Sequence, residues 1–593
     1  MRHLRNLDFH MSPSRSLAVV LGLLVSASTF AAASDEFHAL LDEAWEARLL
    51  NSPMMASQMG DKRYNDRWRD RSIAAIEARQ AQARDFLRRT YAIDRNALSE
   101  SDQLNYELYR RGLQTTVDGF QFNGHLLPFS HRGGVQNLEN DATRLNFETV
   151  KDYDDWLARM SKVPVVIDQT IKLAEQGRKS GYVSPKIQMQ RIPDQIAIQL
   201  VDDVEASPYY KIFAKLPASI DDAEQQRIRA TARETIKTSI LPAYKKLDRY
   251  FSNTYLPACR DSIGLSSLPN GSAWYEHRAR RYTTTQMTPD DIHRLGLNEV
   301  RRIRDEMQQI IDQVDFAGDF DDFLVFMRSD PQFYFDNPDD LYEAYLATSK
   351  RIDPELVKLF GKLPRMPYGV KPIPDSIAPD TTTAYYSGPA ADGSRAGIYW
   401  VNLYKPEVRP KYEIEVLSVH EAMPGHHLQI ALQQELGDLP NFRRYGGFTA
   451  FVEGWGLYSE NLGYDLGLYK DPYSRFGQLT YEMWRAVRLV VDTGMHYKGW
   501  TRQQAIDFFK DNAAKTELDI TNEIDRYIGN PGQALAYKIG QLKMLTIRQR
   551  AEIALGDDFD VRAFHDELLG AGALPLDLLE QRMDAWLADL KRD

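Results

Sequence analysis

The sequence predicts a mainly α-helical protein of two lobes with one small β-hairpin. Apolar residues recur at helical spacing from residue 35 to about 250 and again from about 410 to the end. The segment 364–410 between them is rich in Pro and Gly and holds two short runs of β-forming residues. The length of 593 residues is several times that of a typical domain, which favours more than one lobe.

The composition is typical of a globular protein and excludes several other classes. Hydrophobic residues make up 43% and charged residues 26%, which rules out a disordered chain and a collagen-like repeat. The formal net charge of −11 gives no support to a general binder of nucleic acid or anionic membranes. Because Cys259 is the only cysteine, an intrachain disulfide and a cysteine-based zinc site are excluded. We expect Cys259 to be inert rather than a nucleophile.

Residues 1–33 are predicted to be a secretory signal peptide. Three arginines within the first 15 residues precede an uncharged apolar run, 17–33, which ends in three alanines before Ser34. No cysteine follows the run, which argues against lipid modification. We therefore expect a periplasmic or secreted protein with no stable membrane anchor after cleavage. An uncleaved N-terminal anchor is the alternative.

The mature chain is predicted to divide into an N-terminal helical lobe, residues 34–265, and a C-terminal catalytic lobe, residues 266–593. In the first lobe, apolar residues at a spacing of 3.6 predict helices over 37–49 and around 156–171. In the second lobe, Thr288 followed by proline and two acidic residues predicts the start of a helix, with Thr288 as its N-cap.

The segment 364–410 is predicted to hold a β-hairpin. Residues 381–386 and 397–404 are rich in Thr, Tyr, Val and Ile, and turn residues separate them. We interpret 397–404 as a candidate edge strand for a peptide substrate, because main-chain hydrogen bonds bind any sequence. An ordinary structural hairpin is the alternative.

Three of the twelve histidines fall within the eight residues 420–427, which apolar helical sequence flanks. A zinc-peptidase helix ordinarily carries histidines at i and i+4, with a glutamate after the first that acts as general base. His420 and Glu421 fit this pattern, but Pro424 occupies position i+4. A straight helix would bring His427 beside His420, whereas a bulge at the Pro-Gly pair would bring His426 there. We favour the bulge; a cluster of surface histidines at a kink is the alternative.

Glu453 is predicted to supply a third ligand from a second helix. It lies in an apolar, aromatic setting, where an unpaired carboxylate would be costly. Glu460 follows seven residues later on the same helix face, where it is expected to orient a ligand histidine or to bind a substrate amine. His427 is expected to turn aside and to contact a carboxylate such as Glu460 or the substrate. A pair of surface acids is the alternative.

These motifs resemble those of the bacterial family grouped as domain of unknown function 885. That family carries His-Glu-Ala-x-Pro-Gly-His-His, Glu-Gly-Trp and Pro-Gly-Gln-Ala-x-x-Tyr-Lys, which this sequence matches at 420–427, 453–455 and 531–538. The family is distantly similar to the gluzincin metallopeptidases, namely the neurolysin group, carboxypeptidase Taq and angiotensin-converting enzyme. In those enzymes a Gly-His pair and a Phe-Val-Glu run supply ligands, and they match 425–426 and 451–453 here.

The resemblance implies a mostly helical, two-lobed, gluzincin-like zinc peptidase with a deep cleft. Zn²⁺ would be held by His420, His426 and Glu453. The related enzymes use a tyrosine as donor to the oxyanion of the tetrahedral intermediate, and Tyr537 is the candidate here. Core packing of Tyr537 is the alternative. Lys538 is a candidate for binding a substrate carboxylate, although we favour a solvated lysine.

A polar stripe formed by Arg485, Arg488, Asp492 and His496 follows one face of an otherwise apolar helix. Arg488 and Asp492 have the i,i+4 spacing of an ion pair, and we favour a structural pair inside the helical core. The alternative is a cleft lining in which Arg488 and His496 support metal ligands or bind substrate.

Together these features predict an exported zinc peptidase that hydrolyses peptide bonds by metal-activated water, with Glu421 as general base. The expected partner is a peptide substrate, and no nucleic acid is expected. Two alternatives remain, a catalytically silent peptidase-like binding protein and a zinc hydrolase of non-peptide amides. The oligomeric state and the preference for a chain end do not follow from the sequence.

Overall fold

The computed structural model describes residues 13–374, 378, 382–390, 393, 395–437 and 439–591, with side chains described from residue 32. The chain forms two compact units, Met1–Asn51 with Ala74–Phe120, and Ser52–Ile73 with Gln121–Asp593. The boundary that we predict after residue 265 lies within the second unit and remains a prediction.

The described part of the first unit holds three α-helices, α1 (Pro13–Asn51), α3 (Ile73–Ala92) and α4 (Glu100–Gly119). Phe37, Leu40, Leu41 and Leu49 are buried, as the helical spacing predicts. Of the predicted signal peptide, residues 1–12 lie outside the described residues and the remainder belongs to α1, so its cleavage stays a prediction. Within the part of the chain that the structure describes, no helix combines the length and the apolar character needed to cross a bilayer.

The second unit begins with short helices around one buried core, which extends from residue 129 to Cys259. The apolar stripe around 156–171 is buried apart from Ile171, which is partly buried. It divides into two helices at Lys162 because Pro164 lies in the first turn of the second helix. Burial raises the pKa of the Cys259 thiol to about 12, which agrees with an inert cysteine. The helices of this part are α2 (Pro53–Gln58), α5 (Val150–Ser161), α6 (Val163–Lys179), α7 (Lys186–Met189), α8 (Ile192–Ala197), α9 (Lys211–Ala214), α10 (Asp222–Thr235), α11 (Leu241–Tyr250) and α12 (Leu256–Ala258).

Longer helices make up the rest of the second unit. The predicted helix start is confirmed, because the side chain of Thr288 accepts a hydrogen bond from the backbone of Asp291 at the beginning of α14. The helices are α13 (Gly271–Thr283), α14 (Pro289–Gln313), α15 (Phe320–Ser329), α16 (Pro338–Ile352), α17 (Ile414–Glu421), α18 (His426–Glu435), α19 (Asn441–Arg444), α20 (Thr449–Asp465), α21 (Pro472–His496), α22 (Arg502–Lys510), α23 (Glu517–Gly529), α24 (Ala536–Leu555), α25 (Val561–Gly570) and α26 (Leu576–Leu590).

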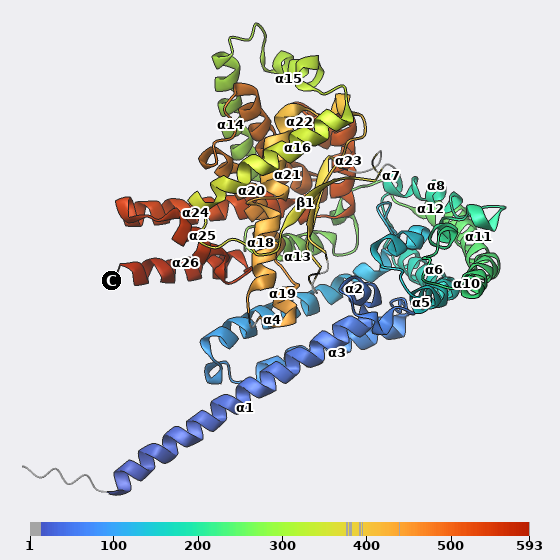
Figure 1. Ribbon diagram of the computed structural model, residues 1–593, viewed down its shortest axis with the longest axis horizontal. Coiled ribbons are helices and arrows are strands. Elements are labelled where there is room, and N and C mark those ends of the chain that lie inside the picture. The colour runs from blue at the N-terminus through green and yellow to red at the C-terminus, as the bar shows by residue number, and fades with distance from the viewer. Residues whose placement is uncertain are drawn as a thin grey trace, which may run out of the picture. The chain divides into compact units, whose positions relative to one another are not determined.

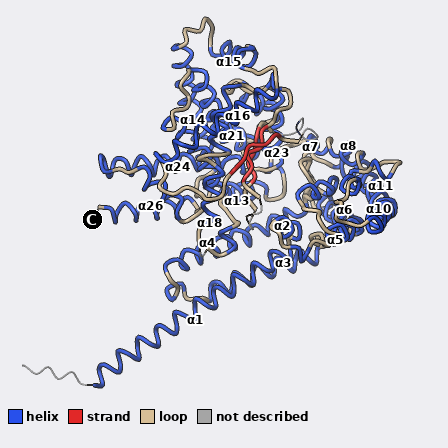
Figure 2. Tube along the Cα trace, viewed as in Figure 1, coloured by secondary structure: helices blue, strands red, loops and turns tan. Residues whose placement is uncertain are grey.

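The described chain holds one small sheet among these helices (Figure 2). Its strands are β1 (Tyr368–Pro372), β2 (Ala384–Ser387) and β3 (Gly397–Val401), in the order β1-β3-β2. The hairpin prediction is confirmed by the antiparallel pairing of β2 with β3, whereas β1, which pairs with β3 in parallel, was not predicted. The expectation of an edge strand at 397–404 is wrong, because β1 pairs with the second side of β3 and places that strand at the centre.

The sheet lies beside the helix that carries His420. α16 packs against β1 (Figure 1). α17 packs against β2, and also against α16 and α20. α20 and α24 cross at two glycines, where a Cβ atom on Gly454 would lie 2.5 Å from the Cα of Gly540. The two backbones can therefore approach closely, which fixes the position of α20 and of the carboxylates that it carries.

Candidate metal centre

The predicted distortion at Pro424 is a complete break between two helices. α17 ends at Glu421 and α18 begins at His426, with a four-residue turn between them. The expected bulge inside one continuous helix is therefore wrong, since one helix ends and a second begins. Pro424 has no N–H to donate, so the hydrogen bonds of a continuous helix cannot run through it. Gly425 closes the turn by donating its N–H to the Val419 carbonyl at 2.9 Å. A Cβ atom on Gly425 would lie only 1.9 Å from the carbonyl oxygen of His420, so the turn requires glycine.

The turn brings His420 and His426 together in front of Glu453. Their ring centroids are 4.8 Å apart, with the planes almost perpendicular at 87°. The Nε2 atoms of His420 and His426 lie 4.0 and 3.5 Å from Oε2 of Glu453. Three potential ligand atoms, from α17, α18 and α20, thus lie within 4.8 Å of one another. These are the three residues that the sequence predicts as ligands.

Glu460 lies behind His420 and holds its other nitrogen. Oε1 of Glu460 is 2.8 Å from Nδ1 of His420, and Nη2 of Arg485 is 3.3 Å from the same oxygen. Burial raises the pKa of Glu460 to about 8 against the opposing charge of Arg485. When Glu460 is ionised it accepts the Nδ1 proton of His420, so the lone pair of Nε2 points toward Glu453.

Glu421 lies at the end of α17, beside the three-residue cluster. Burial raises its pKa, the neighbouring charge of His426 lowers it, and Glu453 raises it further. The backbone N–H of Tyr386, in β2, also lowers this pKa. The Glu421 carboxylate therefore lies near β2, His426 and Glu453.

His427 points away from the cluster. Its Nδ1 lies 2.8 Å from the hydroxyl of Tyr386, and its Nε2 lies 3.0 Å from the carbonyl oxygen of Met366. The expected contact with Glu460 is therefore wrong, because Glu460 is used by His420. A Cβ atom on Gly397 would lie 2.3 Å from the Tyr386 hydroxyl oxygen, so a glycine in β3 makes this arrangement possible. His427 ties α18 to the sheet.

Tyr537 lies beside Glu453. Burial raises the pKa of Glu453, but hydrogen bonding and charge from His426, the charge of Arg526 and a hydrogen bond from Tyr537 together lower it. Nη2 of Arg526 is 3.2 Å from the Tyr537 hydroxyl, and the guanidinium carbon of Arg488 lies 4.3 Å from the centroid of the tyrosine ring. The hydroxyl of Tyr537 is thus held next to the predicted ligand set.

The other residues of the predicted polar stripe have partners within the protein. Arg488 pairs with Glu523 at 3.2 Å and not with Asp492, which accepts hydrogen bonds from the Tyr275 hydroxyl and from the backbone of Gly532. Each ring nitrogen of His496 lies 3.0 Å from a backbone group, the N–H of Leu265 and the carbonyl of Tyr527. Both nitrogens are thus occupied, so the expectation that His496 supports ligands or binds substrate is wrong.

Lys538 is neither solvated nor open to substrate. Its side chain is fully buried, and Nζ lies 2.7 Å from Glu482, 3.0 Å from Glu299 and 2.8 Å from Gln541. Both expectations for Lys538 are wrong, because the helix that begins at Ala536 directs this side chain into an ionic network with α14 and α21.

Residues that sequence reasoning missed complete the site. Gly456 provides space for His420, because a Cβ atom there would lie 2.8 Å from Cε1 of its ring. Arg526 and Tyr386 were also missed. The i,i+3 spacing of Glu523 and Arg526 was a signal for an ion pair, whereas nothing in the sequence places Tyr386 near Glu421.

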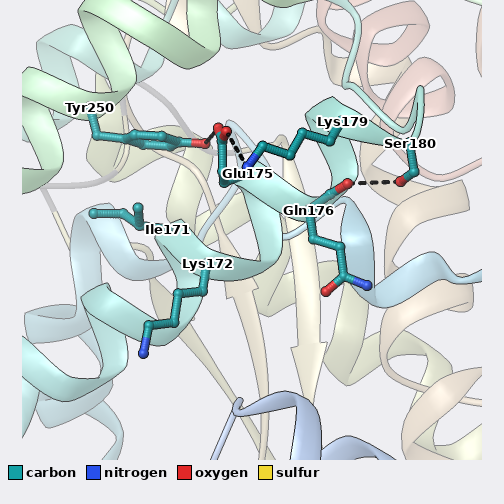
Figure 3. Close-up of a pocket in the computed structure, with 7 residues that line it drawn as sticks. All are labelled: Ile171, Lys172, Glu175, Gln176, Lys179, Ser180 and Tyr250. Carbon is teal, nitrogen blue, oxygen red and sulfur yellow. Dashed lines mark hydrogen bonds and ion pairs between the residues drawn. The ribbon is translucent and has the colours of Figure 1, made fainter.

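A surface pocket of about 540 Å³ lies away from this cluster, on α6 and α11 (Figure 3). Its Glu175 carboxylate already accepts from Tyr250 at 3.4 Å and pairs with Lys179 at 3.4 Å. The pocket contains none of the predicted site residues. It is lined by Ile171, Lys172, Glu175, Gln176, Lys179, Ser180 and Tyr250.

Comparisons with known proteins place the chain in a family. The family profile described as "Bacterial protein of unknown function (DUF885)" matches residues 53–583. The crystal structure of a candidate lipoprotein from Colwellia psychrerythraea is similar over 94% of this chain and 100% of its own, with 28% identity and a TM-score of 0.85. A candidate lipoprotein of unknown function from Shewanella oneidensis is similar over 92% and 99%, with 18% identity and a TM-score of 0.73, and so shares the fold. No functionally curated protein matches. The family match covers most of the sequence, and the chain therefore belongs to the DUF885 family.

Proposed function

We propose that this protein is an exported zinc-dependent peptidase with Glu421 as its general base. The convergence of His420, His426 and Glu453, with Glu421 beside them, carries the proposal. The first three are the ligand types of catalytic zinc sites, which use three protein ligands and leave one position open.

The donor set fits a zinc ion. Tetrahedral coordination at about 2.1 Å separates neighbouring ligand atoms by about 3.4 Å. The separations between Glu453 and the Nε2 atoms of His426 and His420 are 3.5 and 4.0 Å, and all three ligand atoms lie within 4.8 Å, so a bound ion would draw the three side chains closer together. Glu460 supports the first histidine in the manner of the carboxylate–histidine pairs that orient zinc ligands.

The protein's own groups supply the proton transfers. When bound, zinc would lower the pKa of a water molecule and polarise the scissile carbonyl. Glu421 accepts a proton from the attacking water and passes it to the leaving amine, for which a raised pKa is suitable. Tyr537 is the candidate donor to the oxyanion, because its hydroxyl is held beside Glu453.

Export rests on two observations. The apolar segment 17–33 follows three arginines and ends in small residues, as in a secretory signal peptide. The Colwellia protein, which is 28% identical over its whole length, is described as a candidate lipoprotein and thus as a protein that leaves the cytoplasm.

Metal analysis combined with a peptide screen tests the proposal. Purified mature protein is expected to hold about one zinc per chain, to cleave peptides, and to lose both properties in the His420→Ala and Glu453→Ala variants. Full zinc occupancy in both variants would show that the metal binds elsewhere. Normal zinc content without cleavage of any peptide would favour a binding protein or a hydrolase of other amides.

A further inference from the structure

Three arginines gather around Tyr537, the tyrosine beside Glu453. Arg526 donates to the Tyr537 hydroxyl at 3.2 Å, and the guanidinium group of Arg488 lies over the tyrosine ring. Arg132 interacts electrostatically with Arg526 and with Tyr537. The sequence analysis did not predict that these arginines meet at Tyr537, because Arg132 precedes the other two by several hundred residues.

Hydrogen bonds place the loop that carries Arg132 next to α23. The carbonyl of His131 accepts from the side chain of Gln195, in α8, at 2.8 Å. Arg191, just before α8, pairs with Asp525 in α23. Since Asp525 directly precedes Arg526, these contacts hold the loop against the turn of α23 that faces Tyr537. Arg132 itself remains exposed.

The charges of this group do not balance. Glu523 lies 3.2 Å from both Arg488 and Arg526 and is the carboxylate that these two share. Among the described residues, no hydrogen bond or ion pair to the Arg132 side chain is present, and Nη1 of Arg488 is buried without a partner. A second carboxylate would relieve the repulsion between guanidinium groups.

We propose that Arg132, backed by Arg526, binds a carboxylate group of the substrate, so that the enzyme favours peptides with a free C-terminal carboxylate or an acidic side chain near the cleaved bond. The inference rests on the proposed peptidase function and names its substrate class. An exposed guanidinium group with no protein partner, beside the tyrosine that contacts a predicted metal ligand, is suited to this role because arginine binds carboxylates through two parallel hydrogen bonds.

The test compares one short peptide in three forms: with a free C-terminus, with a C-terminal amide, and with its acidic side chain replaced by the matching amide. Each is offered to zinc-loaded wild type, Arg132→Gln and Arg249→Gln, where Arg249 is an exposed arginine on α11.

Arg132→Gln is expected to lower kcat/KM about 10- to 100-fold for the form whose carboxylate is recognised, the size of a lost charge-assisted hydrogen bond. The form that lacks this carboxylate is expected to change less than about 2-fold, and Arg249→Gln to match wild type. The form that shows the loss identifies which carboxylate is bound. An equal loss on all forms, or no loss, would overturn the proposal.

Binding decides the question independently of catalysis. Calorimetry with the Glu421→Gln protein compares an N-acetylated dipeptide that has one acidic side chain with its C-terminal amide and with its side-chain amide. Tighter binding of the diacid than of one of the amides, lost in Arg132→Gln, supports the carboxylate site even if the wild type cleaves no peptide and the peptidase proposal fails. Equal affinities for all three, or a preference that survives Arg132→Gln, would refute it.

Discussion

Hydrogen bonds to ring nitrogens decide which histidines of the 420–427 motif can act as ligands. Nδ1 of His420 is held by Glu460, so Nε2 is left to face Glu453. His427 has a partner on both nitrogens, the Tyr386 hydroxyl and the Met366 carbonyl. A histidine whose two nitrogens are both hydrogen-bonded has none left for a metal without rearrangement.

The adjacent histidines should therefore respond differently to substitution. His426→Ala is expected to lose most of the zinc, whereas His427→Ala is expected to retain it and to lower the free energy of unfolding by about 1–3 kcal/mol, because its buried partners are left unsatisfied. Metal content and denaturant unfolding of both variants measure this. Zinc retained in His426→Ala but lost in His427→Ala would reverse the assignment.

Glu421 separates metal binding from chemistry. Glu421→Gln keeps the size of the side chain and removes its ability to accept a proton. We expect normal zinc content and a fall in kcat of at least about 100-fold, a typical contribution of general acid–base catalysis. Zinc analysis and steady-state kinetics on one preparation check the zinc content and the fall in kcat. An unimpaired Glu421→Gln enzyme would remove Glu421 from the mechanism.

At the scale of elements, α20 organises the site. It presents Glu453 and Glu460 on one face, seven residues apart, and two of its glycines admit neighbouring parts of the site. Gly454 admits the backbone of α24, and Gly456 admits the ring of His420. Because α17 ends at the break before Pro424, the position of His420 depends on packing against α20 rather than on a continuous helix.

Filling the space at Gly456 tests this dependence. In Gly456→Ala, a Cβ atom 2.8 Å from the His420 ring must displace it. Because a disturbed ligand orientation typically costs 10- to 100-fold in metal affinity, we expect a loss of about this size. The control is Gly112→Ala, where a Cβ atom meets nothing within 4 Å. Zinc affinity is measured by competition with a chelator, and equal affinity in the two variants would contradict the packing argument.

At the scale of the molecule, the buried ions around Lys538 join α14, α21 and α24. Lys538 bonds Glu299 and Glu482, and Arg302 also pairs with Glu482 at 2.5 Å. Burial raises the pKa of Glu482, but the charges of Lys538 and Arg302 outweigh it and lower the pKa to about 2. A carboxyl group with a lowered pKa stabilises the fold above its ordinary pKa of 4.5, and this contribution is lost as the pH falls toward 2.

Lys538→Met should expose this contribution. Removing one partner leaves buried carboxylates uncompensated, so the free energy of unfolding at neutral pH is expected to fall by about 3–5 kcal/mol. The loss of stability between pH 4.5 and 2 is expected to be smaller in the variant, because the pKa of Glu482 is no longer lowered as far. Denaturant unfolding across this range measures both effects, with Lys245→Met on the exposed face of α11 as control. Unchanged stability would show that the network contributes little.

The sequence by itself determined the helical class, the hairpin and the residues worth testing as ligands. Helical periodicity, the N-cap at Thr288 and β-forming runs are local signals, and they predicted α14 and the pairing of β2 with β3. The spacing of Glu453 and Glu460 was enough to place them on one helix face, and proline at position 424 was enough to favour a distortion there over a straight helix.

Only the tertiary structure decided how these pieces meet. Whether β3 lies at an edge depends on β1, which carries glycine and proline and gives a weak strand signal. Whether Lys538 is solvated depends on which face of α24 packs against α14 and α21. The partners of His420 and His427 come from α20, β2 and the segment before β1. Sequence spacing predicts only which residues are neighbours on one element, whereas these hydrogen bonds join elements that are far apart in the sequence.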